Sequence, residues 1–401
     1  NIPSRGIGLA QCCIQEGFID SLLRAWMILR KTVKIRDYLI ELENKMKGRL
    51  VSQIITKGNN NLDFIRLLAS LSVIVYHSFV LNPQWGIVDP VKNTFGYVTT
   101  GGLAVKIFFF ISGLLVTNSL LTRKSIPQFI ISRVLRVFPG LAFVVIITAF
   151  AIGPIFTNIP VIEYFKSNQP ILYVLKNITL ETQYFLPGVF ERNKYGVNGS
   201  LWTIRYEVLA YITLVFLYLI GLGKKRWLSS LLCFIVIVEP FMPYKGMLFA
   251  SSDNNAIYLL APCFALGSLL AINKNHYRTN AYIPALLFIS QFAFESEAVS
   301  SLLMCLSVCL IILHISSIQT IIKIKINHDI SYGVYLWGFP IQQIISQNFN
   351  VNFTLNIITS IIIIVPIALC SWFFVEKPSL KLSKKISEMK PKCNLIKSIR
   401  K

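Results

Sequence analysis

Ten apolar stretches, each close to the length of a membrane-spanning helix, follow one another between residues 62 and 375. A helix needs about 20 apolar residues to cross the hydrocarbon core of a bilayer. A soluble protein of 401 residues that is 54% hydrophobic and only 14% charged could not bury so much apolar surface. The sequence therefore predicts an all-α polytopic membrane protein with about ten transmembrane helices, at residues 62–81, 103–122, 137–157, 201–221, 227–243, 256–272, 281–294, 298–317, 329–348 and 354–375.

The basic residues between these stretches fall in alternate connections, which is the pattern of loops that stay in the cytoplasm. Connections on the opposite side carry few lysines or arginines, or balance them with carboxylates. The alternation predicts an even number of spans with both termini cytoplasmic, and it explains the net charge of +21 without nucleic acid as a partner. The basic residues placed in the cytoplasmic loops are Arg123, Lys124, Arg133, Arg136, Lys224, Lys225, Arg226, Lys274, Arg278, Lys323 and Lys325.

The transmembrane region has a polar segment on each side of it. Residues 24–49 alternate charged and aliphatic side chains, which suits a helix on an anionic membrane surface. The competing interpretation is that the natural start is Met46 and that residues 1–45 are an extension without function. The long connection 158–200 is expected on the outer side as a lid or acceptor-binding element. The predicted segments are a polar N-terminal extension (1–61), a transmembrane domain (62–376) and a basic cytoplasmic tail (377–401).

Arg66 and His77 both lie inside the first apolar stretch. Ionisable side chains are expensive at membrane depth, so each indicates a functional site. Eleven helical steps turn through roughly 1100° and rise about 16 Å, which places both side chains on one face. Arginine binds phosphate bidentately, and histidine can act as a general base near neutral pH. A packed, hydrogen-bonded histidine is the alternative for His77.

Arg133 and Arg136 stand three residues apart at the cytoplasmic start of the third stretch, so they project to one side of a helix. They suit a two-arginine clamp for a polyphosphate at the membrane surface. Ordinary anchoring by the positive-inside rule is the competing interpretation.

Two further stretches carry unusual residues. Ser112 and Gly113 lie in the middle of the second stretch, where small residues allow helices to approach closely. Glu207 enters the fourth stretch and needs a partner there, either His77 or a sugar hydroxyl. Trp202 opens the same stretch, and a belt aromatic at the membrane interface is its simplest explanation.

In this order, these segments resemble the type 3 membrane acyltransferase family, which O-acylates carbohydrates in bacteria. The similarity covers roughly residues 60–380, and it departs at Lys106 and Gly338, where many members carry Asp and His. The matching elements are Arg66 followed by ten residues and His77; Phe109-Phe110-Ile111-Ser112-Gly113; Arg133-Val134-Leu135-Arg136; Ser200-Leu201-Trp202 through Glu207; Ser331-Tyr332-Gly333-Val334-Tyr335-Leu336; and Glu376-Lys377-Pro378.

The resemblance implies an integral protein of the bacterial inner (plasma) membrane, similar to the stand-alone members of the family. It implies transfer of an acyl group, most often acetyl, from acyl-CoA to a hydroxyl of a surface or lipid-linked polysaccharide such as O-antigen or exopolysaccharide. His77 and Glu207 would be catalytic, with His77 deprotonating the acceptor or forming an acyl-histidine. The other implied roles are CoA binding for Arg66, Arg133 and Arg136, and structural or substrate-lining positions for Ser112, Gly113, Trp202, Tyr332 and Tyr335.

Acyl-CoA, a glycan acceptor and membrane lipid are thus the expected partners. The eight cysteines contain no pair of C-x-x-C motifs, so no metal site is predicted. A transporter of carbohydrates or lipid intermediates is the alternative function, although the repeated halves typical of such proteins are not evident in the sequence.

Overall fold

The computed structural model describes residues 48–388, except residues 57, 192–194, 222–224, 242–256, 258, 325 and 350. The regular elements in this part of the chain are all helical, apart from isolated β-bridges that join Leu50 to Arg278 and Thr157 to Val189. The predicted start-site extension at residues 1–45 and most of the alternative interfacial helix lie outside the described residues.

Each predicted apolar stretch contains a helix. Six helical segments are long and apolar enough to cross a membrane: Leu62–Leu81, Thr100–Arg123, Ile126–Phe156, Trp202–Leu219, Glu297–Ser316 and Phe353–Glu388. Helices α12, α13, α14 and α17 do not reach that standard within the described residues, so the count of ten spans stays a prediction. The helices are α4 (Leu62–Leu81), α6 (Thr100–Arg123), α7 (Ile126–Ile147), α11 (Trp202–Leu219), α12 (Arg226–Val238), α13 (Leu260–Ile272), α14 (Tyr282–Ser290), α15 (Glu297–Ser316), α17 (Ser331–Asn348) and α18 (Phe353–Ser371).

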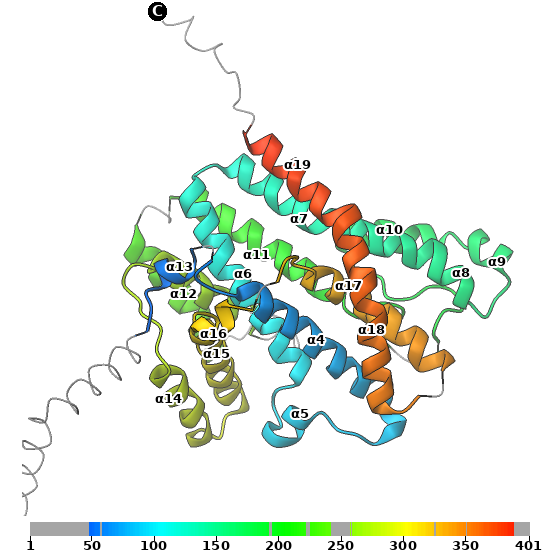
Figure 1. Ribbon diagram of the computed structural model, residues 1–401, viewed down its shortest axis with the longest axis horizontal. Coiled ribbons are helices and arrows are strands. Elements are labelled where there is room, and N and C mark those ends of the chain that lie inside the picture. Colours follow the sequence, from blue (N-terminus) through cyan, green and yellow to red (C-terminus); the bar gives the residue numbers. More distant parts are fainter. Residues whose placement is uncertain are drawn as a thin grey trace, which may run out of the picture.

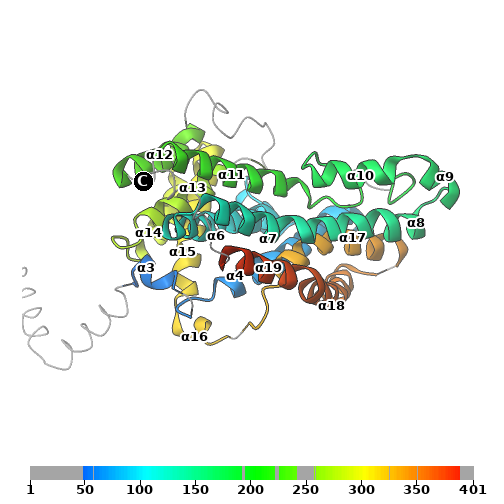
Figure 2. The same cartoon turned by 90° about the horizontal axis from the view of Figure 1, so that it is seen from above.

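Small residues let neighbouring helices of the bundle pack closely together. Helices α7 and α11 run lengthwise along the molecule (Figures 1 and 2), and α4 packs against both α6 and α17. The closest approach joins α6 to α13, because a Cβ added to Gly113 or Gly267 would collide with a backbone carbonyl of the other helix. Small residues let membrane helices gain van der Waals contact where no hydrophobic effect drives association.

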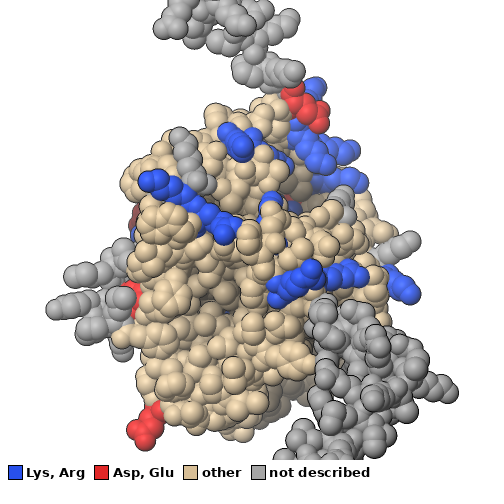
Figure 3. All heavy atoms as spheres, turned by 90° about the vertical axis from the view of Figure 1, so that its left-hand side faces the viewer, with Lys and Arg blue, Asp and Glu red and all other residues tan. Residues whose placement is uncertain are grey.

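One end of the molecule is basic and holds both ends of the described chain. The segment before α4 reaches it through the bridge from Leu50 to Arg278. Helix α19 (Lys377–Glu388) returns along α7, and Gln128 Nε2 donates to the Ser387 carbonyl at 2.9 Å. Figure 3 shows lysine and arginine side chains spread across this face.

The connection 158–200 lies at the opposite end as a small helical unit (Figures 1 and 2). It follows α8 (Gly153–Phe156) and contains α9 (Val161–Lys166) and α10 (Gln169–Ile178). Tyr164 and Tyr173 are completely buried inside it, and the Tyr164 hydroxyl donates to the Ala149 carbonyl at 2.7 Å. The unit is therefore tied to the membrane helices, while its role as a lid stays a prediction.

Candidate functional site

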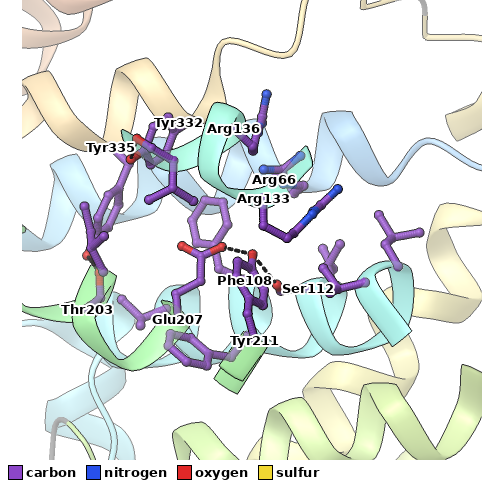
Figure 4. A pocket seen from close by; sticks show the side chains of 17 residues that line it. Arg66, Phe108, Ser112, Arg133, Arg136, Thr203, Glu207, Tyr211, Tyr332 and Tyr335 are labelled. Carbon is purple, nitrogen blue, oxygen red and sulfur yellow. Dashed lines mark hydrogen bonds between the residues drawn. The ribbon is translucent and has the colours of Figure 1, made fainter. Parts of the chain in front are cut away.

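A cavity of about 120 Å³ opens among helices α4, α6, α7, α11 and α17 (Figure 4). His77, Gly113 and Trp202 do not line it. The predicted site residues that do line it are Arg66, Ser112, Arg133, Arg136, Glu207, Tyr332 and Tyr335.

Two of the arginines converge on one carboxylate. Arg66 Nη1 and Arg136 Nη2 each lie 2.6 Å from Oδ2 of Asp329, which precedes α17. The Ser331 hydroxyl donates to the other oxygen, Oδ1, at 2.6 Å. Asp329 was not among the predicted site residues, and its only signal in the sequence was a lone carboxylate at the edge of an apolar stretch. A carboxylate held this way occupies the place where two guanidinium groups would grip an oxyanion.

Arg133 is separate from this cluster. Its guanidinium carbon lies 5.9 Å from the centre of the Tyr211 ring, and it forms no ion pair with any residue that the structure describes. Arg133 and Arg136 both reach the cavity, but Arg136 is grouped with Arg66 around Asp329. Among the described residues, Arg133 therefore has no carboxylate partner, whereas Arg66 and Arg136 share one.

A hydrogen-bonded chain links two of the predicted elements through a residue that sequence reasoning missed. The Tyr211 hydroxyl donates to Glu207 Oε1, one helical turn earlier on α11. The same hydroxyl lies 3.0 Å from the Ser112 hydroxyl on α6 (Figure 4). Tyr211 thus sets the position of the Glu207 carboxylate.

Trp202, which opens α11, packs its ring against Tyr206, at 6.0 Å between centroids, and stays outside the cavity.

The tyrosines of α17 close the cavity on another side. The Tyr332 hydroxyl donates to the Val137 carbonyl at 2.8 Å, and the Arg136 guanidinium carbon lies 5.9 Å from the Tyr332 ring. The Tyr335 hydroxyl lies 2.8 Å from that of Thr203 (Figure 4), and the Tyr335 ring packs against Phe108 at 5.9 Å. These contacts give both tyrosines a fixed place in the wall.

His77 shares its face of α4 with Arg66, as predicted, and that face meets α17. Arg66 contacts Asp329 just before the helix, and the His77 ring meets Phe339 edge-on at 4.8 Å. Phe339 lies one helical turn beyond Tyr335 on α17, so His77 lies about one turn further from the basic end than the residues that line the cavity. The imidazole keeps an exposed fraction of 8%, and its Nδ1 is buried without a hydrogen-bond partner among the described residues.

The predicted partnership of Glu207 with His77 is not what the structure contains. Glu207 faces the cavity from α11 and is held by Tyr211, whereas His77 lies in the contact between α4 and α17. Linear order along the chain could not reveal this, because the rotation of each helix decides which neighbour its polar side chain meets.

The last element of the resemblance supplies a second buried carboxylate. Glu376 ends a π-helical turn, Trp372–Glu376, where one extra residue per turn redirects the side chain inward. It fits because Gly140 and Gly333 have no side chains there, and its Oε1 accepts from the Ser371 hydroxyl at 3.3 Å. Glu376 therefore lies close to the arginine cluster without an ion pair of its own within the described part of the chain.

Known proteins share sequence similarity across this region. A family model described as an acyltransferase domain matches residues 59–376. An O-acetyl transferase of Shigella phage Sf6 is 28% identical over 340 residues, which cover 81% of this chain and 97% of that protein. The peptidoglycan O-acetyltransferase OatA of Listeria monocytogenes is 26% identical over 332 residues, covering 70% of this chain and 49% of that protein. No solved structure matches the chain at a comparable level.

Proposed function

Because the chain belongs to the acyltransferase 3 family of O-acyltransferases, we propose that it moves an acetyl group from acetyl-CoA to a hydroxyl of a surface or lipid-linked polysaccharide. O-acetylation of an envelope glycan also fits the Listeria relative, which is a peptidoglycan O-acetyltransferase. The basic face would be cytoplasmic, as the positive-inside rule favours, in a bacterial inner membrane.

The arginines support binding of the donor from the basic end. Arg133 has no carboxylate partner among the described residues, and a phosphate oxygen can replace Asp329 between Arg66 and Arg136. Guanidinium groups bind phosphate bidentately, and charge-assisted hydrogen bonds of this kind are among the strongest in proteins. In this proposal the nucleotide stays on the basic face, and the thioester end enters the cavity that these arginines line.

The transfer step would use His77 on the same face of α4, one layer beyond the cavity wall. The imidazole accepts the proton of the sugar hydroxyl while the oxygen attacks the thioester carbonyl. The C–S bond then breaks, and the leaving thiolate takes the proton from the imidazolium. The acyl-histidine variant uses the same nitrogen as a nucleophile, with the alcohol attacking in a second step. Glu207, held at Oε1 by Tyr211, has its other oxygen to accept a hydrogen bond from the sugar.

The thioester must pass the aromatic pair Phe108 and Tyr335 to reach His77. Tyr335 and Phe339 are one turn apart on α17, and Phe339 touches His77, so this aromatic pair lies between the cavity and the histidine. Closing aromatic rings around the reacting carbonyl would exclude water and limit hydrolysis of the donor.

The single observation that carries the proposal is the common face of Arg66 and His77, with three guanidinium groups at one end of it. The test is His77→Ala in cells, with mass spectrometry of the surface polysaccharide. Acetylation should disappear while the level of protein in the membrane and the export of glycan persist. His276→Ala is the matched control, since His276 lies exposed at the basic end beside Arg226.

The same experiment separates the enzyme from the transporter. If His77→Ala stops export and the glycan was never acetylated by cells that contain the wild-type protein, the transporter interpretation replaces this one. Acetylation that survives in the variant would remove His77 from the mechanism.

A further inference from the structure

A buried amide lies beside His77 in the contact between α4 and α17. Gln342 is completely buried, and its Nε2 donates to the Ile74 carbonyl at 2.8 Å and to the Ser78 hydroxyl at 3.0 Å. A primary amide has only two N–H donors, so both are committed to α4. The carbonyl oxygen of Gln342 is the only polar atom that the side chain has left to offer.

That oxygen and one imidazole nitrogen are complementary. Gln342 Oε1 is buried without a hydrogen-bond partner among the described residues, and so is His77 Nδ1. Gln342 binds Ile74 and Ser78, which precede and follow His77 on α4. Phe339, which meets the His77 ring, lies three residues before Gln342 on α17, so the two unpaired atoms lie in the same contact. An unpaired polar atom is costly to bury, and a hydrogen bond between these two atoms would satisfy both.

The rest of the polar network prevents the amide from flipping. The Ser78 hydroxyl is itself bonded to Asn356 Oδ1 at 3.0 Å, and Asn356 Nδ2 donates to the Ser346 hydroxyl at 3.1 Å. A flipped Gln342 would place its own carbonyl against the Ile74 carbonyl, acceptor facing acceptor. Helices α4, α17 and α18 thus hold the amide in one orientation.

We infer that Gln342 is a positioning residue that accepts a hydrogen bond from Nδ1–H of His77 and so keeps the lone pair on Nε2. The inference rests on the proposed function, in which His77 transfers the proton or receives the acyl group. Which nitrogen carries the hydrogen in a neutral histidine is set by what the other nitrogen meets. A neutral amide can orient the imidazole without placing a charge of its own inside the membrane, where ionised groups are expensive.

The direct test is ¹⁵N solid-state NMR of the full-length protein in bilayers, with labelled histidine and with His77→Ala to assign the signal. In the wild type, His77 should carry its hydrogen on Nδ1. In Gln342→Leu, the signal should shift toward a mixture of the two tautomers. A wild-type His77 protonated on Nε2 would overturn the inference, whatever happens to activity.

Kinetics give a second, independent measurement. Gln342→Leu should lower kcat by about 10- to 100-fold, the usual cost of removing a group that orients a functional histidine. It should leave the KM for acetyl-CoA unchanged. An unchanged kcat, or a loss confined to KM, would contradict the inference.

Gln343→Leu is the matched control for folding. Gln343 is equally buried on the next position of α17, but its Nε2 donates to the Gly196 carbonyl at 2.6 Å. This variant should lower Tm without changing the His77 tautomer. If His77→Ala leaves acetylation intact, the proposed function fails, while the tautomer measurement still decides the role of Gln342.

Discussion

The two ends of the contact between α4 and α17 are built from different chemistry. At the basic end, Arg66 and Arg136 share Asp329, and these side chains keep exposed fractions of 14–21%. At the other end, Gln342 and Asn356 are completely buried and join α4 to its neighbours through neutral hydrogen bonds. Taking ions fully out of water costs several kcal/mol each, whereas satisfied amides cost little. Along this contact, the ion pair is therefore at the end that a ligand or water can reach, and the fully buried end is neutral.

The largest effect expected from this comparison is at the charged end. Arg133→Ala combined with Arg136→Ala should weaken acetyl-CoA binding by at least about 100-fold, because each charge-assisted hydrogen bond contributes about 1.5–3 kcal/mol. Isothermal titration with purified protein measures it. Arg226→Ala is the control, since this exposed arginine lies outside the cavity and pairs with His276. Unchanged CoA affinity would make Arg133 and Arg136 anchors for topology.

The neutral end should respond in stability and not in CoA affinity. Asn356→Leu removes the partner of the Ser78 hydroxyl and should lower the free energy of unfolding by about 2 kcal/mol. Thermal unfolding at low and high salt should show the same loss, because no ion is involved. Asn348→Leu is the control, since Asn348 is exposed near the end of α17. A CoA affinity reduced as strongly as in the arginine variant would erase the distinction between the two ends.

Asp329→Asn tests whether Asp329 competes with the donor. Removing the carboxylate should tighten acetyl-CoA binding about tenfold, or about 1.4 kcal/mol, because Arg66 and Arg136 no longer need to release it. The unliganded protein should melt at a lower temperature, since two guanidinium groups lose their counter-ion. Asp63→Asn should do neither, because Asp63 is 58% exposed and 3.9 Å from Arg66. Weaker CoA binding in Asp329→Asn would show that Asp329 supports the donor site instead.

The smallest effect is expected within the cavity. Tyr211→Phe removes the hydroxyl between Glu207 and Ser112 and should lower kcat by about five- to tenfold, near 1 kcal/mol, with little change in the KM for acetyl-CoA. Steady-state acetyl transfer to purified polysaccharide measures both constants. Tyr218→Phe, further along α11, is the control. A kcat equal to the wild type would mean that Glu207 does not depend on Tyr211 for its position.

Much of the fold was predictable because helix formation in a membrane is a local matter. Helix α4 has the predicted limits, Leu62–Leu81, and begins where the Asn61 side chain caps it. Backbone polar groups cannot stay unpaired in lipid, so a long apolar stretch becomes a helix whatever its neighbours are. The same reasoning placed Arg66 and His77 on one face. Spacing within one helix is fixed by 3.6 residues per turn.

The partners across helices were beyond that reasoning. Asp329 between two arginines, Ser112 beside Tyr211, and Gln342 beside the His77 segment of α4 each join different elements, and they depend on how each helix is rotated. Of the two partners expected for Glu207, His77 lies outside the cavity that Glu207 lines, and a sugar hydroxyl stays a prediction.

By itself, the sequence determined that this chain forms membrane helices, which of their faces carry ionisable groups, and to which family it belongs. Only the tertiary structure decided which of those groups meet. Local hydrogen bonding and apolar length set each helix, whereas rotation and packing between helices depend on small residues such as Gly113 and Gly140, whose effect appears only when the neighbouring helix is in place.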